Sequence, residues 1–181
     1  GADLFLDGLD FFALKPRRAV FAICSELGIP AVTAAPLGMG VALLNFLPGK
    51  QDFENYFRLA GQNEQEQLLR FLVGLSPAML NRGYLVDPRA VDFDGHRGPS
   101  TPMACELCAG VAATQVLKIL LNRRKITCAP HGLQFDAYRD KCVRTWRPWG
   151  NHNPIQRLTI ASVRWQLERM RKKRAKSVSV L

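Results

Sequence analysis

The sequence predicts an α/β fold in which a mixed sheet is flanked by helices. Residues 4–6 form a short apolar run with an acidic residue at each end, a pattern typical of a buried parallel strand. A helical stretch at residues 14–27 is stopped by Gly28 and Pro30, and a second strand follows at residues 31–35. Because strand, helix and strand in this order default to a right-handed crossover, we expect the two strands to pair in parallel.

The remaining elements follow from apolar periodicity and from turn residues. In chain order they are a turn at 36–40, a strand at 41–47, helices at 52–59 and 63–72, a short helix and strand at 79–86, an exposed loop at 87–102, a helix from 102 to about 121, strands at 126–130, 133–138 and 141–146, and a terminal helix from 153. Two helix starts carry caps, since Asn63 has Glu66 three residues later and Thr101 precedes Pro102. The strand at 141–146 is expected to fold back as a hairpin, which adds antiparallel pairs to the sheet.

The composition indicates one globular core and a basic end. The chain has 181 residues, of which 48% are hydrophobic, and a formal net charge of +10. Most of the excess is near the C-terminus, where Glu168 alone opposes a group of cations: Arg164, Arg169, Arg171, Lys172, Lys173, Arg174 and Lys176. Cations are favourable at a helix C-terminus, so part of this run needs no partner. The run is also basic enough to bind RNA or an acidic protein.

The sequence favours a cytoplasmic location. No apolar run approaches the roughly 20 residues that span a bilayer, so we expect no membrane contact, and the N-terminus has no signal peptide. The five cysteines are an odd number, which without a secretory signal indicates reduced thiols. The chain starts almost directly with a strand, so we expect it to be the C-terminal part of a longer α/β domain.

Two acidic residues follow the first strand. Asp7 ends the strand and Asp10 lies three residues further on. Ligands of open α/β sheets bind at the carboxyl ends of the strands, where these carboxylates would meet them. An aspartate before a helix is also a common N-cap, and spacing alone does not separate the two interpretations.

The cysteines and histidines offer weaker candidates. Cys105 and Cys108 have the spacing of half a zinc site, but Cys128 and Cys142 are single and distant, so we expect no zinc and two small thiols on a closely packed helix. A catalytic thiol near the start of that helix is the less favoured alternative. The histidines, His96, His131 and His152, lie in loops and are expected at the surface.

The aromatic residues near the hairpin end admit two interpretations. Trp146, Trp149 and Arg147 would suit stacking on a nucleotide base, but packing of the hairpin end on the terminal helix explains them more simply.

The ordered set of motifs resembles the second half of an adenylating domain. Asp7-Gly-Leu-Asp10 after a strand, Gly28-Ile-Pro-Ala-Val-Thr-Ala-Ala35 and Met39-Gly40 entering a strand are similar to the ThiF/MoeB-type family, which is related to ubiquitin-activating enzymes. The helix that ends near Leu121 also resembles a late helix of that family, with Lys118 at its recurrent lysine. The resemblance covers roughly residues 3–145 and implies a Rossmann-like ThiF-type fold, present here as its C-terminal half.

The resemblance implies ATP and magnesium as cofactors and a carboxylate as substrate. Members adenylate the C-terminal carboxylate of a ubiquitin-like or sulfur-carrier protein. By this resemblance Asp10 is the catalytic acid that holds Mg²⁺ at the triphosphate, Asp7 is its companion in cofactor binding, and Lys15 is at a cofactor-binding position where arginine is common. A cation held there offsets the repulsion between carboxylate and triphosphate.

Some residues depart from the family pattern. Phe11 replaces the usual asparagine, and Gln115 replaces the acid expected three residues before Lys118. The Gly-rich phosphate loop belongs to the family's first half, and residues 36–40 do not replace it because they connect two strands. The chain alone is therefore expected to bind ATP weakly and to need a complementing N-terminal half or a homodimer partner.

The sequence predicts two units and leaves two functions open. Residues 1–150 would be the C-terminal part of the adenylating domain and residues 151–181 a basic helix and tail. The first function is carboxylate adenylation; the alternative is a non-catalytic interaction module whose tail binds an acidic partner or RNA. A nicotinamide-dependent oxidoreductase ranks last, because it requires the absent dinucleotide fingerprint.

Overall fold

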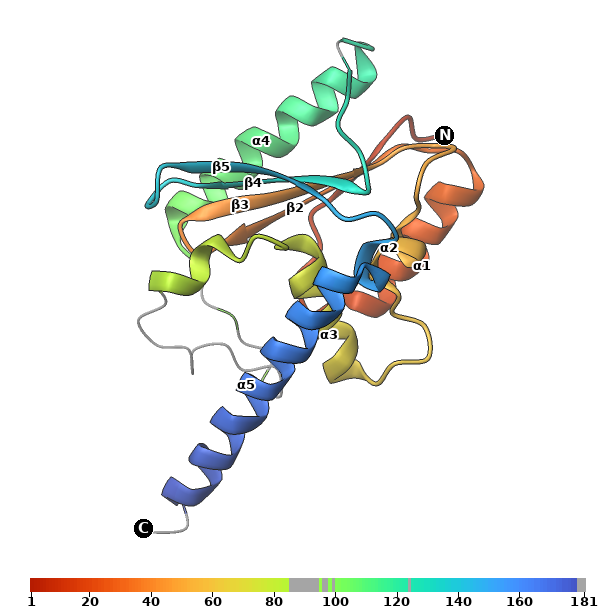
Figure 1. The fold of residues 1–181 in the computed structure, drawn as a ribbon. Coiled ribbons are helices and arrows are strands. Elements are labelled where there is room, and N and C mark those ends of the chain that lie inside the picture. Colours follow the sequence, from red (N-terminus) through yellow and green to blue (C-terminus); the bar gives the residue numbers. More distant parts are fainter. Residues whose placement is uncertain (85–94, 96–97, 99, 124, 179–181) are drawn as a thin grey trace.

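A computed structural model describes residues 1–84, 95, 98, 100–123 and 125–178, with side chains as far as Arg171. The strands are β1 (Phe5–Asp7), β2 (Ala31–Leu37), β3 (Gly40–Phe46), β4 (His131–Asp136) and β5 (Lys141–Trp146). The α-helices are α1 (Leu14–Glu26), α2 (Phe53–Phe57), α3 (Glu64–Leu75), α4 (Pro102–Leu120) and α5 (Pro154–Val178), and the 3-10 helices are η1 (Leu80–Tyr84) and η3 (Gly150–His152) (Figure 1).

The five strands form one mixed sheet in the order β1-β2-β3-β4-β5. β1 and β2 are parallel, with Asp7 opposite Thr33, as the crossover through α1 requires. The other three pairs are antiparallel. Each residue of β3 is buried, which explains its nearly continuous apolar sequence.

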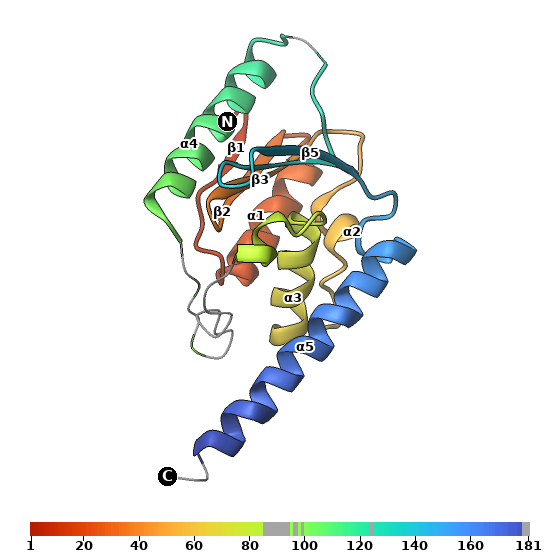
Figure 2. The ribbon, with the colours of Figure 1, turned by 60° about the vertical axis from the view of Figure 1, so that its left-hand side comes forward.

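Helices cover the two faces of the sheet unequally. One face carries α4, which contacts β2 and β3. The other face is covered by α1, α2 and α3, and α5 packs on the outside of α3 (Figure 2). The main core lies on this second face, where Phe21, Phe53 and Phe57 form an aromatic cluster with Phe46 of β3.

Most predicted elements are confirmed. The caps are as expected, because the Asn63 side chain accepts a hydrogen bond from the Glu66 N–H and Thr101 accepts one from the Ala104 N–H. The predicted strand at 126–130 is wrong: no strand is found there, although the Ala129 N–H donates to the Asn45 carbonyl, and the Thr127 carbonyl accepts from the Asn45 side chain. The predicted 87–102 loop and the end of the 79–86 segment lie mostly outside the described residues.

Helix α4 corrects the expectation about apolar runs. It is the one described helix whose length and mean hydropathy, 1.5, would allow it to cross a membrane, because Glu106 and Lys118 are its only charges. Only 17% of the residues in this apolar stretch of α4 are buried, among them the small residues Ala104 and Ala112. The helix touches the sheet along a narrow stripe and leaves Leu117 and other apolar side chains in solvent.

Helix α5 is held against α3 by a mixed set of contacts. Ile160 and Val163 are buried against Leu69 and Val73, and the Gln156 side chain donates to the Val73 carbonyl.

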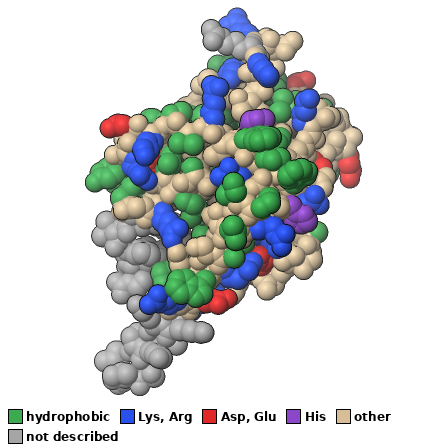
Figure 3. Space-filling model, in the orientation of Figure 1, with side chains coloured by type: hydrophobic (Ala, Val, Ile, Leu, Met, Phe, Trp, Pro, Cys, Tyr) green, Lys and Arg blue, Asp and Glu red, His purple; other side chains and the backbone are tan. Residues whose placement is uncertain are grey.

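On the face shown in Figure 3, basic side chains are scattered among hydrophobic ones and do not form a single patch. The division of the chain at residue 150 stays a prediction.

Candidate functional site

A large cavity opens where β1 and β2 end. It has a volume of about 1110 Å³, and its lining comes from the turn after β1, the end of β2, η1, α3 and α4. The carboxyl ends of parallel strands are the usual ligand position in open α/β sheets. Asp7 and Asp10 both line this cavity, so the structure brings the two predicted acids together at one opening.

Asp7 is fully engaged by protein groups. It is 7% exposed, and its Oδ2 accepts hydrogen bonds from Arg17 Nε at 2.7 Å and from the Thr33 hydroxyl at 2.8 Å. Its Oδ1 accepts from the Leu9 N–H at 3.2 Å. A carboxylate with these partners is held as part of the site's frame, and its role as a cofactor ligand stays a prediction.

Arg17 is the residue that sequence reasoning missed. Besides its ion pair with Asp7, its guanidinium donates to the backbone carbonyls of Leu9 at 2.7 Å, Asp10 at 3.1 Å and Phe11 at 3.3 Å. It is 3% exposed and lies over the Phe71 ring, 4.7 Å from its centroid. Arg17 therefore fixes the whole turn between β1 and α1, and with it the position of Asp10.

Asp10 is the carboxylate that remains available to a ligand. Its side chain is exposed and accepts one hydrogen bond, from the Phe12 N–H to Oδ1 at 2.9 Å. The capping alternative is wrong, because α1 begins at Leu14 and its N-cap position is Ala13. Among the described residues Asp10 forms no ion pair, so the second carboxylate oxygen is free to bind a cation.

The other predicted cofactor residue lies elsewhere. Lys15 is exposed on the first turn of α1 and does not line the cavity. Arg82 of η1 does line it and has no ion pair within the described part of the chain. Lys15 as a cofactor ligand stays a prediction that this arrangement does not support.

Tyr84 closes the cavity beside the β2–β3 turn. Its hydroxyl accepts from the Met39 N–H at 2.8 Å and donates to Asp136. Burial and the hydrogen bond to Asp136 raise the pKa of Tyr84. Gly38 has a φ of +63°, and a Cβ there would overlap the Tyr84 ring, so this close approach requires glycine.

The two thiols of α4 face the same cavity and are not closely packed. Cys105 is exposed and Cys108 is half-buried. Burial, with smaller contributions from Cys105 and Asp7, raises the pKa of Cys108 to about 11. Cys108 is therefore a protonated thiol near neutral pH, which makes it a poor nucleophile.

The remaining candidates are at the surface. His131 and His152 are exposed, and His96 lies outside the described residues. Trp146 and Trp149 are 61% and 66% exposed, so the expected packing on α5 leaves most of each side chain in solvent. Arg147 reaches that helix, donating to Gln156 at 3.2 Å.

The donor set fits a cation that arrives with its own ligands. Within the described part of the chain no three metal-binding side chains lie close together, so these residues do not form a site that binds a cation with protein ligands alone. Mg²⁺ is commonly bound by one or two carboxylates together with substrate phosphates and waters. Asp10, with one free oxygen at the opening of a large cavity, fits that mode.

The comparisons with known proteins agree with the fold. A search of curated proteins found no match. The model of the ThiF family matches residues 1–157, which is most of the chain and includes every strand. Members of that family have a Rossmann-like fold, and the mixed five-stranded sheet with helices on both faces is consistent with it. The chain belongs to the ThiF family.

Proposed function

We propose that this chain forms part of an ATP-dependent adenylating site that activates the C-terminal carboxylate of a ubiquitin-like or sulfur-carrier protein. The observation that carries the proposal is the pairing of an engaged carboxylate with a free one: Arg17 holds Asp7, and Asp10 faces the cavity without an ion pair. ThiF family membership supports the reaction class.

The residues present suit the cation-binding part of this reaction. Asp10 would hold Mg²⁺ bound to the triphosphate, and the cation would offset the repulsion between phosphates and the attacking carboxylate. Arg17 holds the turn through three backbone carbonyls, which places Asp10 at the opening of the cavity in the folded chain. Leu9, Phe12 and Met39 supply an apolar part of the cavity lining.

The residues present do not suit phosphate binding by this chain alone. Arg82 is the one cavity cation in the described part of the chain that is not already engaged by an acid. We therefore propose that the phosphate-binding cations come from a second protein segment, either a complementing N-terminal half or another copy. The apolar surface of α4 supports such an association, since Met103, Leu117 and Leu120 are more than half exposed.

The test is the exchange of pyrophosphate into ATP by the chain together with the second segment that supplies the phosphate-binding cations, measured with each of the cell's ubiquitin-like and sulfur-carrier proteins in turn. Asp10→Asn should lower the exchange rate by at least about a hundredfold, because it removes the charge that holds the cation. Asp3→Asn is the matched control, since Asp3 is also exposed and N-terminal but does not line the cavity. Equal rates in the two variants would remove Asp10 from the site.

A non-catalytic interaction module is the alternative. It is favoured if no carrier protein supports exchange although the chain binds such a carrier. An acidic protein or RNA would then be sought at the basic end of α5, where Arg169 is exposed and lies over the Trp165 ring.

A further inference from the structure

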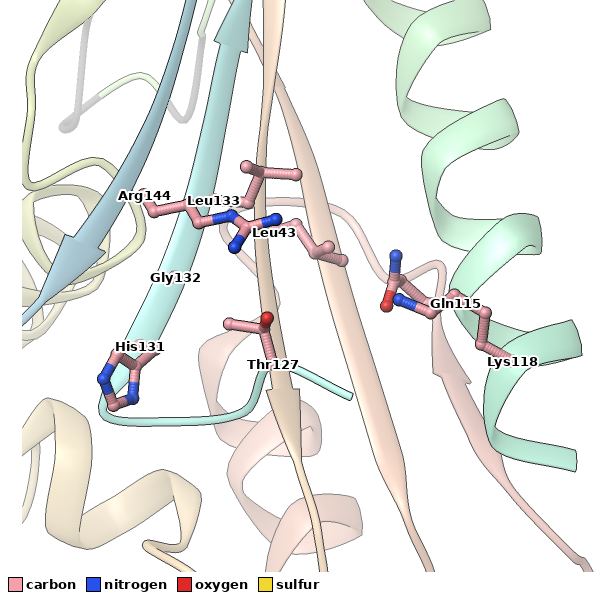
Figure 4. A pocket seen from close by; sticks show the side chains of 8 residues that line it. All are labelled: Leu43, Gln115, Lys118, Thr127, His131, Gly132, Leu133 and Arg144. Atoms are coloured by element: carbon pink, nitrogen blue, oxygen red, sulfur yellow. The ribbon is translucent and has the colours of Figure 1, made fainter. Parts of the chain in front are cut away.

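A second, smaller cavity lies beside the last turns of α4. It has a volume of about 90 Å³ and shares no lining residue with the cavity at Asp10. Four elements and one loop residue form it: α4 contributes Gln115 and Lys118, β3 contributes Leu43, β4 contributes residues 131–133, β5 contributes Arg144, and Thr127 precedes β4 (Figure 4). A space of this size has room for several waters or for one tetrahedral oxyanion.

The lining is cationic. None of its eight residues is acidic, and Lys118 and Arg144 extend into the space from opposite sides in Figure 4. Among the described residues neither side chain takes part in an ion pair. Two cations that point into one small space repel each other, and an anion between them removes that repulsion.

Gln115 adds a neutral donor whose direction is fixed. Its side chain is 9% exposed, and its Oε1 accepts a hydrogen bond from Asn45 Nδ2 at 3.2 Å. Asn45 is itself buried and donates also to the Thr127 carbonyl at 2.8 Å, which fixes its amide orientation. Because its oxygen is held by Asn45, the NH₂ group is the part of this lining side chain that is left to donate to a ligand, and no hydrogen bond from it is found within the described part of the chain.

We propose that this pocket binds a phosphate-like or sulfate-like oxyanion, held by Lys118, Arg144 and the Gln115 amide. The guanidinium offers a planar pair of donors, the ammonium a point charge, and the amide one further N–H, a set that matches a tetrahedral oxyanion. The neutral side chain at position 115 is essential, because a carboxylate there would pair with the two cations, repel an incoming anion and offer it no N–H donor. The proposal does not depend on adenylation at the larger cavity.

The experiment uses four single variants of the full chain that each lower the net charge from +10 to +9. Three alter the pocket: Lys118→Gln, Arg144→Gln and Gln115→Glu. The fourth, Arg157→Gln, changes an exposed arginine on α5 outside the pocket and is the matched control. Gln115→Glu keeps an acceptor for Asn45, so it tests the site even if another variant folds poorly.

Binding of inorganic phosphate is measured by titration calorimetry at constant ionic strength. The pocket variants should bind at least about tenfold more weakly than the natural chain, the effect of losing one charge-assisted contact, while Arg157→Gln stays within about twofold. Equal weakening in all four variants would show a general charge effect and overturn the proposal, as would no binding by the natural chain below about 10 mM.

A second titration, with O-phosphoserine, distinguishes the sources of the oxyanion. Tighter binding of the monoester, lost in the same three variants, would assign the pocket to a phosphoryl group on a larger molecule. Tighter binding of inorganic phosphate, lost in the same variants, would assign it to the free ion. Phosphoserine binding that the pocket variants leave unchanged would place it elsewhere and count against the pocket.

Discussion

At the scale of single residues, the site depends on how two aspartates of similar appearance differ. Asp7 is buried and engaged by Arg17, whereas Asp10 is exposed and available. The sequence could predict that both acids follow a strand, because strand ends are visible in apolar periodicity. It could not predict which acid is free, because the answer depends on Arg17, ten residues away, folding back from α1. A basic residue on the helix that follows an acidic strand end was the available signal.

The buried pair of Arg17 and Asp7 predicts a large loss on truncation. Arg17→Met should lower the free energy of unfolding by about 3–5 kcal/mol, because it leaves Asp7 charged, buried and without its partner. Arg18→Met is the control: Arg18 pairs with Glu54 at the surface and its loss should cost less than about 1 kcal/mol. Denaturant unfolding of both variants measures the difference, and similar midpoints would show that the buried pair contributes little.

The two thiols of α4 are expected to differ in reactivity. Cys105 is exposed, whereas Cys108 has a pKa of about 11, raised first by burial. Below that pH the thiolate fraction of Cys108 rises about tenfold per pH unit, so its alkylation should accelerate steeply between pH 7 and pH 10. Mass spectrometry after iodoacetamide treatment of Cys105→Ser and Cys108→Ser checks this. Fast alkylation of Cys108 at pH 7 would contradict it.

At the scale of elements, one glutamate links α5 to α3 in addition to their buried apolar contacts. Glu66 of α3 binds Arg70 on its own helix and Arg164 on α5, both at 2.7 Å. Burial by itself would raise the pKa of Glu66, but the hydrogen bonds from Arg164 and Arg70 and their charges lower it overall. A carboxyl group whose pKa is lowered on folding stabilises the folded state at pH values above its pKa in the unfolded chain. This stabilisation is lost as the pH falls through the pKa of the folded chain.

The stability of the natural chain should therefore decline more steeply with acid than that of Glu66→Gln. The difference should be present at pH 6, shrink as the pH falls below the ordinary glutamate pKa of about 4.3, and disappear only below the lowered pKa of Glu66 in the folded chain. Thermal melts across this range measure it, with Glu64→Gln as the control, since Glu64 is an acidic residue in the same first turn of α3. Parallel curves for the natural chain and Glu66→Gln would contradict the assignment.

Caps and turns made most elements predictable, and tertiary contacts decided the rest. Asn63 and Thr101 act as the caps that their neighbours predict. The segment at 126–130 is apolar enough for a strand. However, its Thr127 carbonyl accepts a hydrogen bond from the Asn45 side chain and not from the backbone of a neighbouring strand. Leu158 shows the same limit, since helical spacing does not reveal that it is 73% exposed beside the buried Ile160.

At the scale of the whole molecule, α4 leaves an apolar surface that the rest of the described chain does not cover. Leu117, Leu120 and Leu121 are each more than half exposed at the end of that helix. If a second copy or segment covers them, Leu117→Glu should shift the chain toward monomer in analytical ultracentrifugation. Leu27→Glu is the control, because Leu27 is 68% exposed but lies at the C-cap of α1, on a different helix. A monomeric natural chain would contradict homodimer formation.

The position of β1 has a further consequence for the site. β1 has three residues and lies at the end of the sheet, joined to β2 along one edge. A short edge strand is among the first elements to open, so the strand that presents Asp10 should show little protection from amide hydrogen exchange. A ligand bound to Asp10 would suppress this local unfolding of β1. Slower exchange at residues 5–7, against an unchanged background in β3, would then report binding before any reaction is observed.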